Sequence, residues 1–176
     1  MKCLSVLQPY ASLIALAGHP DPEVRRLAKR FETRSWPTKY RGPLAIHASK
    51  GFPREAKDRC WLYPFYQALS PAGLVNAHIS ADKNFKLPLG AVIATCRLVD
   101  CKEICPDGFA RKCDTARVEN IMPILPEEPE LSFGDYTPGR FAWNLWNVRM
   151  LPEPVPAKGR LGLWEWTPTE GVIIDG

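Results

Sequence analysis

The sequence predicts an α+β fold, a small mixed β-barrel that is partly closed and has short helices flanking a cleft. Five or six segments have the apolar, β-branched character of short strands, and two early segments have helical spacing. Eighteen prolines in 176 residues favour short elements and many turns over long helices. Because there are no internal repeats and no linker-like stretch, we expect one domain over residues 1–176.

The N-terminal elements are expected to be a strand, two short helices and a second strand. Leu4–Val6 is apolar enough to start or flank a strand, and Gln8-Pro9 then opens a helix. One buried stripe of that helix consists of Tyr10, Leu13, Ile14 and Ala17. We expect Gly18 to end the helix as its C′ residue, and Asp21-Pro22-Glu23 to begin a second helix over residues 22–29. Residues 31–35 are predicted to be extended.

The turn Arg41-Gly42-Pro43 leads into a predicted strand over residues 44–49. If this strand buries Leu44, Ile46 and Ala48, its period of two places Ala45, His47 and Ser49 on the opposite face. Residues 53–69 have roughly helical spacing interrupted by Pro64, and residues 70–88 are expected to form a variable loop.

The C-terminal half is predicted to contain three further strands. Residues 90–101 are apolar and β-branched, and residues 142–150 and 160–166 complete the set. Between them, the turn-rich stretch 102–138 is expected to be a long irregular excursion.

Charge and aromatic side chains both point to nucleic acid. The net charge is +4, and the segment from Arg25 to Arg41 holds seven basic residues against Glu32 alone. Phe31, Trp36 and Tyr40 lie within that segment, and such interleaving is typical of surfaces on which unpaired bases stack. A basic stretch is often only a solvated face, so the aromatic residues carry the argument.

Other classes of function find little support in the sequence. No apolar run approaches the roughly 20 residues that span a bilayer, and the N-terminus has no signal-peptide pattern, so we expect a cytoplasmic protein without a membrane partner. The six cysteines lack paired zinc-type spacing, so no metal is expected, and Cys96 is interpreted as a core residue. No phosphate loop, dinucleotide fingerprint or Ser-His-Asp order is present, and no cofactor is expected.

Several motifs together resemble the ASCH family, the activating-signal-cointegrator-homology domains related to the PUA domains. They are Leu4-Ser5-x-x-Gln8-Pro9-Tyr10, then Gly18, Lys29-x-x-Glu32-x-Arg34-Ser35-Trp36, Tyr40-Arg41-Gly42-Pro43-Leu44 and Lys158-Gly159-x-x-Gly162-Leu163-Trp164. The resemblance implies a PUA-like barrel with an RNA-binding cleft between the barrel and the first helices. In the family a single residue separates the glycine from the lysine, whereas here residues 19–28 intervene. We interpret them as an insertion that brings Arg25 and Arg26 to the mouth of the cleft.

The predicted binding residues fall into three groups by chemistry. Phosphate would be held by Lys29, Arg34, Lys39 and Arg41, and bases would stack on Trp36 and Tyr40. Polar edges would be read by Gln8, Glu32 and His47, with Ser49 and Lys50 at the end of the same strand. Each has a structural alternative: a surface ion pair for Lys29 and Glu32, a rim contact for the arginines and aromatics, a helix cap for Gln8, and a core position for His47.

Three functions remain open from the sequence. The preferred one is binding of RNA or a modified nucleotide; the sequence does not identify protein partners. The second is a small hydrolase, because some members of the superfamily hydrolyse the amide of acetylated cytidine and others are proposed to cleave RNA; its catalytic residues would be Lys29, Glu32 and His47. The catalytic threonine of those relatives is replaced by Glu32 in this register, and Thr33 is offset by one residue. The third is a protein-interaction module, which a shallow, apolar cleft would favour. Arg140 and the residues after it are expected to form the far wall of the cleft.

Overall fold

The structure is a computed structural model, and it describes residues 1–77, 85–106, 109–112, 122–123 and 126–168. Its class is α+β, as the sequence predicts. The strands are β1 (Lys2–Val6), β2 (Phe31–Arg34), β3 (Gly42–Ala48), β4 (Ala91–Ile104), β5 (Phe109–Lys112), β6 (Met122–Pro123), β7 (Phe141–Pro156) and β8 (Leu163–Glu165). The helices are α1 (Tyr10–Ala15), η1 (Leu16–Gly18), α2 (Pro22–Arg26), α3 (Arg54–Arg59), α4 (Phe65–Leu69) and η3 (Leu131–Phe133).

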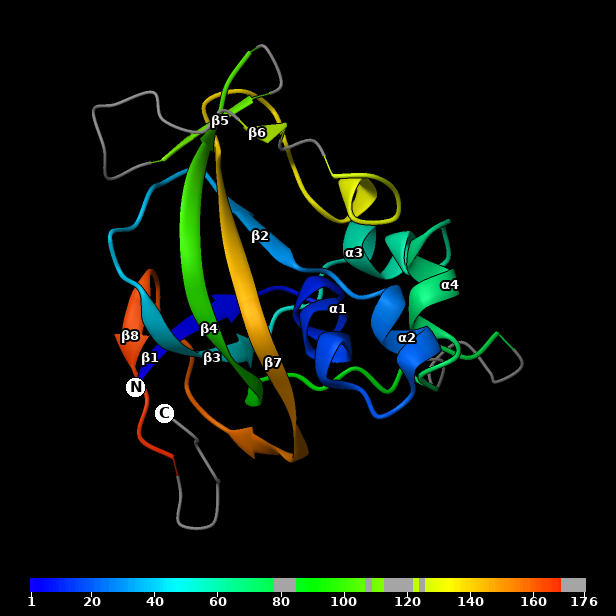
Figure 1. Cartoon of the computed structure of the whole chain (residues 1–176). Helices are drawn as coiled ribbons and strands as arrows, with labels where there is room; N and C mark the ends of the chain where they lie inside the picture. The colour runs from blue at the N-terminus through cyan, green and yellow to red at the C-terminus, as the bar shows by residue number, and fades with distance from the viewer. Residues whose placement is uncertain (78–84, 107–108, 113–121, 124–125, 169–176) are drawn as a thin grey trace.

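The described strands form one mixed, eight-stranded sheet in the order β2-β7-β4-β3-β1-β8, with β5 paired to β4 and β6 paired to β5. β1 and β3 are parallel, whereas β4 is antiparallel to both β3 and β7. Figure 1 shows β4 and β7 side by side along most of their length, with the four α-helices gathered on one side of the sheet. No ladder joins the end strands β2 and β8 among the described residues, so closure into a barrel stays a prediction.

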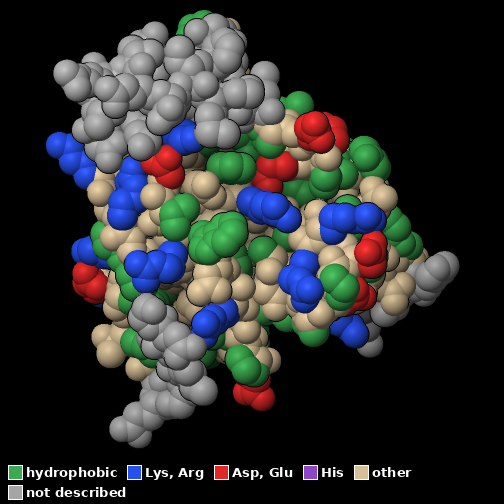
Figure 2. Space-filling view, viewed as in Figure 1, with side chains coloured by type: hydrophobic (Ala, Val, Ile, Leu, Met, Phe, Trp, Pro, Cys, Tyr) green, Lys and Arg blue, Asp and Glu red, His purple; other side chains and the backbone are tan. Residues whose placement is uncertain are grey.

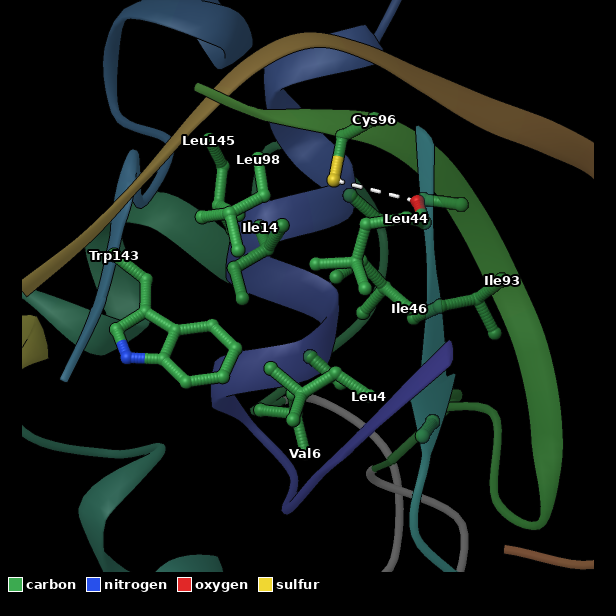
Figure 3. Packing of buried hydrophobic residues seen from close by; sticks show 14 of the residues in the cluster. Leu4, Val6, Ile14, Leu44, Ile46, Ile93, Cys96, Leu98, Trp143 and Leu145 are labelled. Carbon is green, nitrogen blue, oxygen red and sulfur yellow. Dashed lines mark hydrogen bonds between the residues drawn. The ribbon is translucent and has the colours of Figure 1, made fainter. Parts of the chain in front are cut away.

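The largest apolar cluster lies on one face of this sheet (Figure 3). Leu44, Ile46 and Ala48 of β3 all belong to it, which confirms the predicted alternation. The opposite face of β3 is also covered, because Ala45 packs with Trp164 and Trp166 in a second cluster. Cys96 is buried among the first group, as predicted, and its Sγ lies 3.5 Å from the Leu44 carbonyl oxygen.

The first helix buries two faces instead of the single predicted stripe. Ile14 packs on the sheet, whereas Leu13 and Leu16 pack into another cluster, which is built mainly from α2, α4, residues 72–75, Phe85 and Leu87. The helix therefore lies between the sheet and a small helical layer, and this position explains why residues 11–16 are all buried.

Gly18 does not act as the left-handed C′ residue that the sequence led us to expect. It is the last residue of η1 and is not among the glycines with positive φ. A Cβ at this position would lie 2.5 Å from the Met150 nitrogen and 2.8 Å from the Val148 oxygen of β7. The glycine is needed because the backbones approach closely, and not because of its own dihedral angles.

Two predicted boundaries were wrong for identifiable reasons. The second helix ends at Arg26 and not at residue 29, because the chain turns so that the Lys29 N–H donates to the Leu13 carbonyl oxygen at 3.0 Å. Strand β7 continues past residue 150 to Pro156 despite three prolines. Proline is tolerated there because, among the described residues, the register with β4 passes from Met150 directly to Val155, so Pro152 and Pro154 lie in an irregularity without ladder partners, and β2 pairs only with the start of β7.

The segments on either side of β4 also differ from expectation. The stretch 102–138, predicted to be irregular, begins with the end of β4 and contains β5, β6 and η3 within its described residues. The region 53–69 forms two helices, α3 and α4, and α4 begins after Pro64. No described helix is long and apolar enough to cross a membrane.

Candidate functional site

A pocket of about 290 Å³ lies where the end of β1, the start of α1, strand β2 and the 133–140 segment meet. We call it the Lys29 pocket. Its lining residues are Val6, Leu7, Tyr10, Lys29, Glu32, Thr33, Arg34, Arg59, Phe133, Gly134, Asp135 and Arg140. The motif residues Lys29, Glu32 and Arg34 all line this pocket. Glu32 and Arg34 lie on β2, and Lys29 lies two residues before the strand begins.

Lys29 is the central residue of this pocket and is only 1% exposed. Its Nζ donates to the Phe133 carbonyl oxygen at 2.6 Å and lies 3.8 Å from Glu32 Oε2. Burial lowers the pKa of Lys29, and the negative charges of Glu32 and Glu130 partly oppose that shift. The exposed surface ion pair considered from the sequence is therefore not what the structure shows, because Glu32 is also buried, at 7% exposure.

Arg34 connects the pocket to β1. Its Nη2 donates to the Ser5 carbonyl oxygen at 2.8 Å, and its Nε lies 3.0 Å from Glu32 Oε1. That Nε is within ion-pair distance but is buried without a hydrogen-bond acceptor in good geometry. The Glu32 carboxylate is the partner of this guanidinium, through its charge more than through an aligned hydrogen bond.

Glu130 hydrogen-bonds the segment that forms the far wall of the pocket to the start of β2. Its carboxylate accepts from the Arg30 N–H at 2.6 Å, the Phe31 N–H at 3.1 Å and the Tyr136 hydroxyl at 3.1 Å. Burial raises the pKa of Glu130, and these contacts and Lys29 act against the shift. Further along, Thr33 Oγ1 accepts from the Asp135 N–H at 3.0 Å, so its hydroxyl is directed at the wall. The 130–136 segment is thus positioned through β2 itself.

The mouth of the pocket is basic. Arg59 donates to the Tyr10 hydroxyl, and Arg140 Nε lies 3.2 Å from Asp135 Oδ2. Four basic side chains line the pocket against two carboxylates, those of Glu32 and Asp135. This excess of positive charge favours an anionic ligand.

His47, Ser49 and Lys50 line a different and larger cavity of about 1140 Å³, together with residues 156–161. His47 is 1% exposed; its Nε2 contacts the Ala157 carbonyl oxygen at 3.0 Å, and its Nδ1 is buried without a partner. A carbonyl only accepts, so the proton resides on Nε2. Burial lowers the pKa of His47, and the contact with Ala157 opposes this. The structure therefore does not bring His47 together with Lys29 and Glu32.

The other predicted binding residues line neither cavity. Gln8 is buried; its Nε2 donates to the Pro88 carbonyl oxygen at 2.7 Å and its Oε1 accepts from the Ser12 N–H at 3.1 Å, which matches the alternative of a helix cap. Trp36 packs edge-on against Trp143, with ring centroids 4.6 Å apart, and the Tyr40 hydroxyl donates to a backbone carbonyl.

The remaining basic residues of the motif region are dispersed. Arg41 Nη2 lies 3.2 Å from Asp100 Oδ1, and Lys39 is exposed. In the insertion, Arg25 donates to the backbone of residues 19 and 20, and Arg26 pairs with Glu23 at 2.9 Å. Neither arginine lines the Lys29 pocket, so the expectation that the insertion enlarges this basic surface is not met.

Sequence reasoning placed Arg140 on the far wall but missed Arg59, Glu130 and Asp135. These residues lie 25 to 101 positions after Arg34 in the sequence, within segments expected to be helical or irregular. No three His, Cys, Asp or Glu side chains of the described part of the chain are arranged to hold a metal ion. No family model matches this sequence, and no curated protein matches it either.

Proposed function

We propose that the Lys29 pocket binds one nucleotide of an RNA chain, or a free modified nucleotide. The observation that carries the proposal is the fully buried ammonium of Lys29 at the base of a pocket with a basic mouth. Lys29 Nζ and the Glu32 carboxylate offer a donor and an acceptor to the polar edge of a base.

The phosphate would be held by the arginines at the mouth, Arg34, Arg59 and Arg140. The guanidinium fork of arginine matches two phosphate oxygens, and these three guanidinium groups all line the pocket. The volume of about 290 Å³ is at the small end of ligand pockets, which suits a single nucleotide better than a duplex or a peptide.

Binding to a panel of nucleoside monophosphates and short single-stranded RNAs tests this proposal, by calorimetry at two salt concentrations. We expect at least one ligand to bind, and Arg59→Gln to weaken it about tenfold because a charge-assisted contact to phosphate is lost. Arg26→Gln is the matched control, because this exposed arginine lies outside the pocket. If no nucleotide binds, or if Arg59→Gln and Arg26→Gln behave alike, the proposal is wrong.

The second candidate is a hydrolase in the same pocket, and the lowered pKa of Lys29 favours it. An amine whose charged form is disfavoured is neutral more of the time near neutral pH, so its lone pair is available to take a proton or attack a carbonyl, and the Glu32 carboxylate lies 3.8 Å away. Thr33 brings a hydroxyl to the same pocket, although its Oγ1 already accepts from the Asp135 N–H. Mass spectrometry of acetylated cytidine and small RNAs after incubation tests this activity. Loss of an acyl group, or cleavage, that persists in both Lys29→Ala and Glu32→Gln would refute these roles.

We further propose that the sheet closes as the PUA-like barrel of the ASCH family. In support, one face of the sheet holds the main core, short helices pack beside it, and three motif residues meet in one pocket between these layers. Backbone amide contacts between β2 and β8, or between their flanking loops, in an NMR structure would test the closure.

A further inference from the structure

An exposed tryptophan stands on the face of β4 and β7 that is turned away from the main core. Leu145 and Trp143 of β7 point into that core, so Trp146 points outward, and it is 68% exposed. Its cross-strand partner is Arg97 of β4, which is also exposed. Directly paired residues share a face of a sheet, so Arg97 and Trp146 both lie on this outward face.

Backbone irregularities surround this pair. The pairing of β4 with β7 shifts between Thr95 and Arg97, where β7 has one additional residue, and again between Leu98 and Asp100, where β4 has one. The first shift contains Asn147, which has a φ of 50°, in the left-handed region. Bulges increase local twist and redirect side chains, and they are frequent near functional sites.

The same face is basic. Arg149 pairs with Thr95 and lines a small hollow with Arg97 and Asn147. Toward the other end of β4, the carboxylate of Asp100 is balanced by Arg41 at 3.2 Å and Lys102 at 3.8 Å. Figure 2 shows Lys and Arg side chains gathered around a hydrophobic centre over β4 and β7.

We propose that this face, which we call the Trp146 face, is a second binding surface for single-stranded nucleic acid, separate from the Lys29 pocket. A base stacks on the indole of Trp146, and Arg97 and Arg149 contact the phosphates on either side of that base. A large exposed aromatic ring with arginines beside it matches the two chemical parts of a single strand, its base faces and its charged backbone. A duplex offers no free base face, so it binds only through charge.

The test is the binding of a fluorescently labelled oligo(U) of about 10 nucleotides, a length within the site sizes of single-strand binders, measured by anisotropy. We expect Trp146→Ala to weaken binding about tenfold and Trp146→Phe to weaken it less. Arg97→Gln should lower the steepness of the plot of log affinity against log salt by about 0.7. The matched control is Tyr63→Ala, which removes another exposed aromatic ring, 73% exposed and located between α3 and α4.

Affinities of Trp146→Ala and Tyr63→Ala within about twofold of the wild type would overturn the proposal, as would equally tight binding of a duplex of the same length. Self-association that is lost in Trp146→Ala, without a change in RNA affinity, would identify the face as an interface between copies of this chain. The Lys29 pocket is tested separately, because Trp146→Ala should leave the binding of a single nucleotide unchanged. Loss of both kinds of binding together would show that the two surfaces are not independent.

Discussion

Replacing Gly18 with alanine tests the close approach of η1 to β7. The new Cβ would lie 2.5 Å from the Met150 nitrogen, 2.8 Å from the Val148 oxygen and 3.0 Å from the Arg149 Cα. All three are backbone atoms of a strand that is paired with β4, so no flexible side chain can move aside. One of the two elements must shift by several tenths of an ångström.

The expected cost follows from two opposing effects. Inserting a methyl group into a closely packed contact costs about 1–3 kcal/mol, and the upper part of that range applies because three backbone atoms are involved. Alanine recovers about 0.5–1 kcal/mol relative to glycine because it restricts the unfolded chain. We therefore expect a net loss of about 2 kcal/mol in the free energy of unfolding.

Thermal and urea denaturation measure this loss. For a chain of this length about 2 kcal/mol corresponds to a fall in Tm of roughly 4–8 °C. The matched control is Gly51→Ala, because a Cβ at Gly51 meets nothing within 4 Å and its φ is not in the left-handed region. A Gly18→Ala protein as stable as Gly51→Ala would refute the argument from close approach.

Three further predictions concern single residues. Burial lowers the pKa of His47 below 6.5, so the unfolded chain binds more protons than the folded chain around that pH. The free energy of unfolding should therefore fall as the pH falls from about 7.5 to 5. Urea denaturation of His47→Phe at several pH values should show this contribution to the pH dependence removed. Glu130→Ala leaves the Arg30 and Phe31 N–H groups and the Tyr136 hydroxyl without their acceptor, and we expect a loss of about 3–5 kcal/mol in the free energy of unfolding measured in urea, with a smaller loss for Glu130→Gln. Asn147→Val should cost about 1–2 kcal/mol because its φ is 50°, whereas Asn147→Gly should unfold at or above the wild-type temperature.

Local patterns in the sequence were sufficient for much of the fold. The alternation in residues 44–49 predicted which side chains of β3 share a face, and the Asp21 cap predicted the start of α2, where its side chain accepts from the Glu23 N–H at 2.9 Å. Boundaries failed where distant contacts decide them. The three prolines of β7 are tolerated only because of how that strand is paired, and pairing is not visible in local sequence.

The site was predictable where it depends on one short segment. Lys29, Glu32 and Arg34 lie within six residues, and the structure places them in one pocket. The neighbouring basic and aromatic residues were expected in the same cleft because they are close in sequence. Their directions depend on the turn before β3, which sends Arg41 toward Asp100 and His47 to the other cavity. Proximity in the chain does not fix a common direction once the backbone turns.

Two of the segments that line the Lys29 pocket lie about 100 residues apart in the sequence and are joined by the contacts of Lys29 with Phe133 and of Thr33 with Asp135. A ligand in the pocket would contact both segments. It would bind the folded chain and not the unfolded chain, and so would stabilise the fold. The affinity can then be measured from the rise in thermal stability. The free energy of unfolding increases by about 2.7 kcal/mol when the ligand concentration is about one hundred times its Kd. A melting-temperature screen of small metabolites can therefore find the natural occupant before its chemistry is known.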